Sequence, residues 1–216
     1  MEHFRNRTEA GRSLAAALEG LELPRPVVVL GLPRGGVPVA EPIARALGAP
    51  LDVLVVRKLG LPNQPEVAMG AIGEQGARVL NDDIAASVSA SELARIELRE
   101  RDELDARLRR FRGDLPPVDL VGRTAVIVDD GIATGATARV ACLVARARGA
   151  SRIIVATPVA APDSLAAVEA MPEVDEVVCL SAPSGFMAVG MHYLDFTQTT
   201  DAEVQALLEA ARANGR

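Results

Sequence analysis

The chain contains few aromatic residues and few of the histidines and cysteines that disulfide-rich and zinc-binding proteins depend on. Among its 216 residues there is no tryptophan, and there are one tyrosine, four phenylalanines, two histidines and two cysteines. Cys142 and Cys179 are widely separated in apolar settings, which predicts reduced core residues rather than a disulfide or a metal site. His3 and His192 are not spaced with cysteine or acidic partners as a zinc site requires. The sequence therefore argues against a disulfide scaffold and against a zinc domain.

Long hydrophobic runs and a basic charge are also missing. No apolar stretch is long enough to span a bilayer, and no charged-then-apolar signal peptide stands at the start, so we expect a cytoplasmic protein without a membrane partner. The net charge of −6 argues against a general nucleic-acid binder, which would carry a basic field. A local basic cluster that binds an anionic small molecule is compatible with this charge.

Short apolar runs alternate with helical patterns along much of the chain. This alternation favours parallel strands joined by crossover helices, so we predict an α/β fold with a parallel sheet flanked by helices. We expect a core over residues 1–180 and a small C-terminal hood with a final helix over 181–216. Pro42 should either delay or kink the first crossover helix. The predicted strands are 26–30, 51–56, 124–128, 152–157 and 174–180, and the predicted crossover helices are 39–47, 136–148 and 162–170.

Two segments depart from this alternation. Residues 59–66 are rich in turn formers and predict a mobile loop, which begins a flexible 59–81 segment that should end in a short hairpin. Residues 89–112 predict an inserted long helix, because Ser89 and Glu92 have capping-box spacing ahead of an apolar stripe. The charged face of this helix is typical of a solvated surface.

The most informative segment is residues 126–137, Val-Ile-Val-Asp-Asp-Gly-Ile-Ala-Thr-Gly-Ala-Thr. An apolar run stops at two adjacent carboxylates, Asp129 and Asp130, and a Gly/Thr-rich turn leads into a helix that opens at Ala136. Unpaired backbone amides at such a helix start bind phosphate, helped by the helix dipole. Carboxylates would repel a phosphate, so we expect them to bind vicinal sugar hydroxyls. The segment predicts a sugar-phosphate site, although a strand that ends in a polar turn before a capped helix would share the pattern.

Two other strand ends carry cations. Residues 31–36, Gly-Leu-Pro-Arg-Gly-Gly, place Arg34 in a turn of small residues where backbone amides can approach a ligand closely. Arg57 and Lys58 end the next predicted strand, just before the expected mobile loop. From the residues alone, each of these cations could equally be an ordinary surface charge.

Together these segments resemble the type I phosphoribosyltransferases, in which two acids precede a T-G-x-T turn. The likeness covers roughly residues 27–196 and is strongest to a bacterial group with a G-x-P-R-G-G loop, a V-R-K strand end and a D-D-G-x-A-T-G-A turn. Members of the family often have a cis peptide in the 31–36 loop. The resemblance implies that the ribose and 5′-phosphate of phosphoribosyl pyrophosphate (PRPP) are bound by Asp129, Asp130, Gly131, Ala133, Thr134, Gly135, Ala136 and Thr137. It implies that the leaving pyrophosphate is bound by Arg34, Gly35, Arg57 and Lys58, with Arg34, Arg57 and Lys58 stabilising the transition state.

The resemblance also implies a hood over the base, for which the candidate is residues 181–200. Phe186, Tyr193 and Phe196 gather there, and an aromatic face can stack on a planar base. We take Phe186 and Tyr193 as base-binding candidates, with Phe186 preferred, although these rings could instead pack the hood against the core. Ala133 stands where hypoxanthine-guanine enzymes carry an acid that interacts with N7, which makes a 6-oxopurine a poorer candidate.

By this resemblance the chain transfers the phosphoribosyl group of PRPP to a nitrogenous base or a similar nucleophile and releases pyrophosphate. Mg²⁺ is the implied cofactor, carried by PRPP rather than by a metal site of the chain, and no general base can be assigned. A homodimer is the family expectation. Two alternatives stay open: a regulatory protein that binds PRPP without turnover, and a hydrolase that acts through the two aspartates but lacks further metal ligands.

Overall fold

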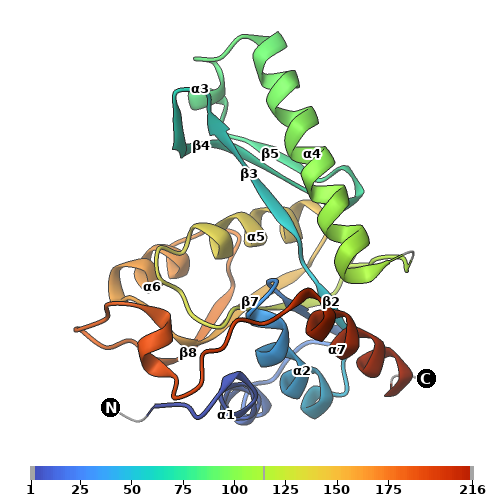
Figure 1. Cartoon of the computed structure of the whole chain (residues 1–216), viewed down its shortest axis with the longest axis vertical. Helices are drawn as coiled ribbons and strands as arrows, with labels where there is room; N and C mark the ends of the chain where they lie inside the picture. Colours follow the sequence, from blue (N-terminus) through green and yellow to red (C-terminus); the bar gives the residue numbers. More distant parts are fainter. Residues whose placement is uncertain (1–2, 114, 215–216) are drawn as a thin grey trace.

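The centre of the molecule is a parallel five-stranded sheet (Figure 1). A computed structural model describes residues 3–113 and 115–214 of the chain. The strand order is β2-β1-β6-β7-β8, and β1 pairs with β6 from Val27 opposite Thr124 to Gly31 opposite Val128. The strands are β1 (Val27–Gly31), β2 (Leu51–Val53), β6 (Thr124–Val128), β7 (Arg152–Val159) and β8 (Glu176–Ser181). The predicted parallel α/β fold is confirmed.

Helices cover both faces of this sheet because its strands are apolar on both sides. Along β1, Val27 and Val29 belong to a core shared with α1, α2 and α7, whereas Val28 and Leu30 belong to a core shared with α5. Helix α2 begins at Gly36, so Pro42 does not delay it, and α1 has no counterpart among the predicted elements. The flanking helices are α1 (Arg7–Glu19), α2 (Gly36–Leu47), α5 (Ala136–Ala147), α6 (Pro162–Glu169) and α7 (Asp201–Asn214).

Residues 56–112, which we call the lobe, project away from the parallel sheet (Figure 1). Three antiparallel strands, in the order β3-β4-β5, pack against the long helix α4 around a small core that includes Met69 and Ile96. Helix α4 begins as predicted, because the Ser89 hydroxyl accepts a hydrogen bond from the Glu92 amide at 3.2 Å. Among the described residues, no helix combines the length and the apolar character needed to cross a membrane. The elements of the lobe are β3 (Val56–Leu61), β4 (Gln64–Gly73), the 3-10 turn η1 (Glu74–Gly76), β5 (Arg78–Leu80), α3 (Asp82–Ala85) and α4 (Ala90–Arg112).

The expected loop over residues 59–66 is instead the tip of a hairpin. Strand β3 continues to Leu61, which pairs with Gln64 of β4, and only the two residues between them turn. Leu59 is fully buried in the lobe core and so holds this part of the chain in the sheet. The pairing shifts register on both sides of Gly60, as is common where a glycine interrupts a strand. The hairpin that was expected at the end of the 59–81 segment is present as the β4–β5 pair.

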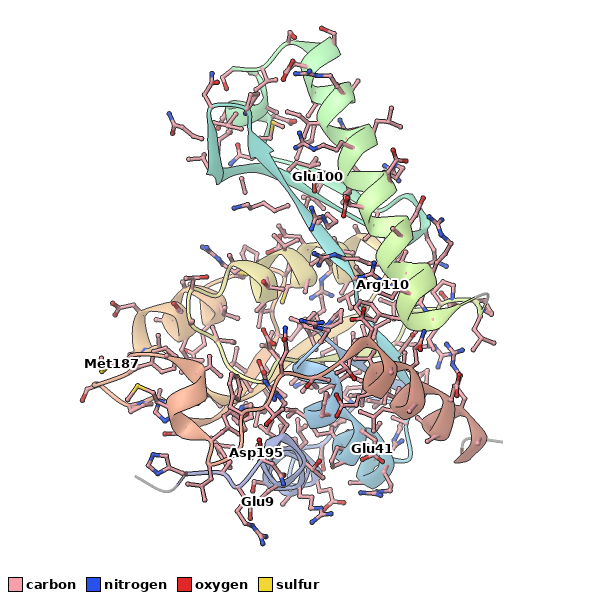
Figure 2. All side chains as sticks on the ribbon, viewed as in Figure 1. Glu9, Glu41, Glu100, Arg110, Met187 and Asp195 are labelled. Atoms are coloured by element: carbon pink, nitrogen blue, oxygen red, sulfur yellow. The ribbon has the colours of Figure 1, made fainter. Side chains whose placement is uncertain are left out.

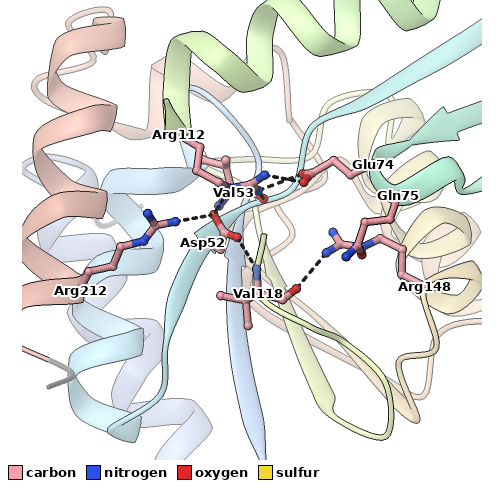
Figure 3. Close-up of polar contacts among 8 residues, drawn as sticks. All are labelled: Asp52, Val53, Glu74, Gln75, Arg112, Val118, Arg148 and Arg212. Atoms are coloured by element: carbon pink, nitrogen blue, oxygen red, sulfur yellow. Dashed lines mark hydrogen bonds and ion pairs between the residues drawn. The ribbon is translucent and has the colours of Figure 1, made fainter. Parts of the chain in front are cut away.

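A buried charge network joins the lobe to the parallel sheet (Figure 3). Arg112, at the end of α4, donates hydrogen bonds to Asp52 and to Glu74, each at 3.0 Å, and to the Val53 carbonyl oxygen at 3.1 Å. Asp52 also accepts from the Val118 amide at 2.9 Å. The three charged side chains are 4 % exposed or less. The lobe is therefore attached to the sheet by ionic contacts that have lost their water and depend on one another.

Candidate active site

Two of the predicted site segments meet where β1 and β6 end, at the same edge of the sheet. Because Gly31 pairs with Val128, the loops that follow these residues lie side by side. The Leu32 amide donates to the Val128 carbonyl oxygen at 2.8 Å and extends this contact by one residue. Open parallel sheets bind ligands at the carboxyl ends of their strands. The structure thus brings the 31–36 loop next to the acid pair.

The acid pair, Asp129 and Asp130, has one oxygen of each carboxylate engaged. Asp129 Oδ1 accepts from the Asp130 amide at 3.0 Å, and Asp130 Oδ2 accepts from Arg7 Nε at 2.8 Å. The Tyr193 hydroxyl donates to the Asp130 carbonyl oxygen at 2.6 Å and so fixes the backbone. Within the described part of the chain, no donor from any further residue reaches the second oxygen of either carboxylate. The acid pair can therefore accept hydrogen bonds from two neighbouring hydroxyls.

The surroundings of Asp129 disfavour its charged form. Burial and then the neighbouring Asp130 carboxylate raise the pKa of Asp129 to about 8, against the smaller opposing effect of Arg7. At neutral pH a large share of the Asp129 carboxyl groups therefore keep their proton, and two full negative charges side by side are disfavoured. An anionic sugar phosphate is repelled less by one charge than by two.

Replacing Asp129 with asparagine should remove part of the pH dependence of stability. The pKa of Asp129 is about 8 in the folded chain, above its ordinary value of 3.8. Between pH 3.8 and pH 8, the folded chain therefore keeps a proton on Asp129 that the unfolded chain has released. Wild-type stability therefore falls as the pH rises through this window. We expect the free energy of unfolding of Asp129→Asn to exceed that of wild type by about 1–3 kcal/mol at pH 8 and by little at pH 4. Urea unfolding at both pH values measures this, and a difference that stays constant with pH would contradict it.

The turn that follows the acid pair has the features of an anion cradle. No hydrogen bond among the described residues uses the backbone amides of Ala133, Thr134 or Gly135, and α5 begins immediately afterwards at Ala136. Gly135 has a φ of 70°, a conformation that glycine adopts without steric cost. Thr134 and Thr137 are exposed, so their hydroxyls are accessible. Free amides at a helix start can bind a phosphate.

The loop after β1 faces the acid pair from the other side. Its Pro33–Arg34 peptide bond is cis, the feature that the family resemblance associates with this loop. A Cβ atom on Gly35 would lie 1.9 Å from Asp130 Oδ2, so only glycine allows this approach. The Arg34 side chain is 38 % exposed and its guanidinium lies 3.5 Å from the Asp201 carboxylate, a weak pair. An anion bound here could draw Arg34 away from Asp201 at little cost.

A cavity of about 460 Å³ lies between this loop and the C-terminal segment. Three of its lining residues are predicted site residues, namely Arg34, Gly35 and Asp130. Phe196, Gln198 and Thr199 also line it and lie in the segment 181–200 that was predicted as a hood, whereas Arg7 was missed by sequence analysis. One signal for α1 was available, because the Asn6 side chain accepts from the Glu9 amide at 3.0 Å, a capping spacing that can be read from the sequence. No local pattern shows that the first residue of this helix meets Asp130.

Arg57 and Lys58 are not among the residues that line this cavity. Both lie on β3, and Arg57 Nε donates to Glu100 of α4 at 2.9 Å. Figure 2 shows Glu100 projecting from α4 toward β3. Pyrophosphate binding by Arg57 and Lys58 stays a prediction, and for Arg57 it requires an anion that competes with Glu100.

The aromatic residues near the site pack against one another. The buried Tyr193 ring lies 5.7 Å from Phe4 and 5.1 Å from Phe196, measured between ring centroids. Phe186 stacks on His192 at 5.5 Å. Base binding by Phe186 and Tyr193 stays a prediction, because a base could stack on Tyr193 only if its ring were uncovered. Phe196 is 37 % exposed and is the aromatic residue that lines the cavity.

Comparisons with known proteins identify the family. The family model for the phosphoribosyl transferase domain matches residues 9–191. Two Mycobacterium tuberculosis proteins, each named "Putative phosphoribosyl transferase", are 54% identical over 213 residues, which is 98% of this chain and 47% of theirs. The chain therefore belongs to the phosphoribosyl transferase domain family, and it spans about half the length of these curated relatives.

Solved structures agree on the fold. The crystal structure of TT1426 from Thermus thermophilus has a TM-score of 0.88 and 48% sequence identity, and the match covers 96% of this chain and 98% of that one. The AQ2163 protein from Aquifex aeolicus has a TM-score of 0.51 at 16% identity, over 94% of this chain and 85% of that one. The second likeness shows the fold alone. The first likeness extends over nearly the whole of both chains.

Proposed function

We propose that this protein is a Mg²⁺-dependent phosphoribosyltransferase that transfers the phosphoribosyl group of PRPP to a nitrogenous base or a similar nucleophile and releases pyrophosphate. The observation that carries this proposal is the acid pair beside the cradle. Among the described residues, Asp129 and Asp130 each keep an oxygen that no residue outside the pair engages, and three unpaired amides follow within five residues. Neighbouring acceptors next to a phosphate site fit a sugar phosphate better than a simple anion or a metal ion.

In this proposal the acid pair orients the ribose by accepting hydrogen bonds from its 2′- and 3′-hydroxyls, while the amides of residues 133–135 hold the 5′-phosphate. The nitrogen of the acceptor attacks C1′ as the bond to pyrophosphate breaks. Arg34 and the Gly35 amide stabilise the negative charge that grows on the leaving group. The transition state carries positive charge on the ribose, so catalysis rests on positioning and electrostatics rather than on a covalent intermediate.

Mg²⁺ would enter the site bound to PRPP, where it neutralises charge on the pyrophosphate. Among the described residues, no group of three or more His, Cys, Asp or Glu side chains could hold a metal ion by itself. The acid pair fits the hydroxyls of a sugar that brings its own metal. We also propose, from the family resemblance, a homodimer in the cytoplasm that acts on small molecules, without a nucleic-acid or membrane partner.

Calorimetric titration of Mg²⁺·PRPP into the wild-type protein, followed by assays of pyrophosphate release with a panel of purine and pyrimidine bases, tests this function. We expect saturable binding and release of pyrophosphate with one base, which would name the acceptor. Binding without release for any base would favour a regulatory protein that binds PRPP. No binding by the folded protein would refute the proposal.

A further inference from the structure

Residues 4–7 lie between the hood and the acid pair. The Phe4 amide donates to the His192 carbonyl oxygen at 2.9 Å, and the Phe4 carbonyl oxygen accepts from the Leu194 amide at 2.8 Å. One residue further along, the Asp195 amide donates to the Arg5 carbonyl oxygen at 2.9 Å. Figure 2 shows Asp195 close to the start of α1. These bonds fix the residues that precede α1 against residues 192–195.

The Arg7 side chain is held from three sides. Its Nε donates to Asp130 Oδ2 at 2.8 Å, and its Nη1 donates to the Thr197 carbonyl oxygen at 2.7 Å. Its guanidinium carbon lies 4.0 Å from the centroid of the Phe196 ring, within the range of a cation–π contact. The Arg7 side chain is only 11 % exposed. A guanidinium fixed in this way holds the carboxylate that it contacts in one orientation.

Arg7 and Arg34 line the same cavity, but their surroundings differ. Arg7 is paired with Asp130 at 2.8 Å, so its charge is largely balanced within the protein. Arg34 is more exposed, and its partner Asp201 lies 3.5 Å away. This contrast suits Arg34 to bind an incoming anion and suits Arg7 to hold Asp130.

We infer that Arg7 is a positioning residue of the sugar site: its ion pair with Asp130 Oδ2 leaves the other oxygen of that carboxylate directed to accept a hydrogen bond from a ribose hydroxyl. This inference rests on the proposed function, because it assigns the sugar subsite of the same site. It adds a residue from α1, outside the two motif-bearing loops, and it separates the subsite for the sugar from the subsite for pyrophosphate.

Two ligands that each carry one half of PRPP test the inference. We expect Arg7→Gln to weaken binding of ribose 5-phosphate about tenfold, the effect of losing roughly one hydrogen bond to a charged group. Binding of Mg²⁺·pyrophosphate should change less than twofold. Arg34→Gln should give the opposite pattern, and Arg7→Lys, which keeps a charged donor, should recover most of the lost affinity for ribose 5-phosphate. Calorimetry with each variant gives the dissociation constants.

The control is Arg12→Gln, which makes the same change at an exposed position on α1 and should alter neither constant. Thermal unfolding of each variant confirms that it is folded. If wild type binds ribose 5-phosphate and Arg7→Gln binds it equally well, or loses pyrophosphate instead, the inference is wrong while the proposed function stands. If wild type binds neither ligand nor Mg²⁺·PRPP, both are wrong.

Discussion

Changing both Asp129 and Asp130 to asparagine should weaken binding of Mg²⁺·PRPP at least 100-fold. Each carboxylate accepts one hydroxyl in the proposed complex, and a hydrogen bond to a charged group is worth about 1.5–3 kcal/mol. Two such losses come to about 3 kcal/mol or more, and each 1.4 kcal/mol is roughly a factor of ten in affinity. The change also removes the charge that holds Arg7, which lies 2.8 Å from Asp130 Oδ2. Calorimetric titration of the double variant measures the loss.

The chain provides a matched control for this experiment. Asp82 and Asp83 are also adjacent aspartates at a helix start, but they are exposed at the beginning of α3 in the lobe. The double variant Asp82→Asn/Asp83→Asn makes the same two substitutions and removes at least as much negative charge, and it should bind Mg²⁺·PRPP like wild type. Equal weakening in both double variants would mean that net charge, rather than the acid pair, governs binding.

Replacing Arg112 with methionine should lower the free energy of unfolding by about 3–5 kcal/mol, the usual cost of leaving buried charges without their partner. Arg112 is 4 % exposed and donates to both Asp52 and Glu74, whose side chains are buried as well. Methionine can fill much of the space, but it leaves Glu74 without this ion pair and leaves Asp52 with the more distant Arg212, at 3.8 Å. Urea unfolding followed by circular dichroism gives the free energy. A loss below about 1 kcal/mol would show that water or other groups replace the arginine.

Two comparisons make this result specific to the network. Arg110→Met removes an arginine from the same turn of α4, but that side chain is 62 % exposed and its partner Asp201 lies 3.4 Å away. The expected loss there is below about 1 kcal/mol. Adding Glu74→Gln to Arg112→Met should restore part of the stability, because it removes the buried charge that has lost its ion pair with Arg112. If Glu74→Gln restores no stability to Arg112→Met, the stability lost by Arg112→Met comes from packing rather than from an unpaired charge.

How much of the site could be predicted depends on how far apart in the sequence its parts lie. Asp129, Asp130 and the cradle occupy consecutive positions, so a strand, two acids and a turn can be recognised together. Arg7 meets Asp130 across 123 positions and Thr197 across 190. Contacts of this kind depend on the backbone pairing of residues 4 and 5 with residues 192–195, which no periodicity in the sequence predicts.

The fold shows the same limit at the tip of the lobe. Turn-forming residues between 59 and 66 indicate that the chain reverses, but they do not distinguish a two-residue hairpin turn from a longer loop. Burial of Leu59 in the lobe core decides between them, and this burial depends on Ile96 and its neighbours in α4. The sheet was predictable because its strands are continuous apolar runs, such as β6, in which all five residues are buried.

The backbone pairing of residues 4 and 5 with residues 192–195 has a consequence for synthesis of the protein. The walls of the cavity come from positions 7 and 199 as well as from the loops that follow β1 and β6, so the pocket does not exist until almost 200 residues have left the ribosome. Contacts between segments this far apart in the sequence cost loop-closure entropy, and they form slowly during folding. A ligand that fills the pocket therefore stabilises the chain only after residue 199 has joined the fold, by about 2.7 kcal/mol at 100 times its dissociation constant. Ligand-dependent resistance to proteolysis in stalled nascent chains should appear abruptly once the hood has emerged.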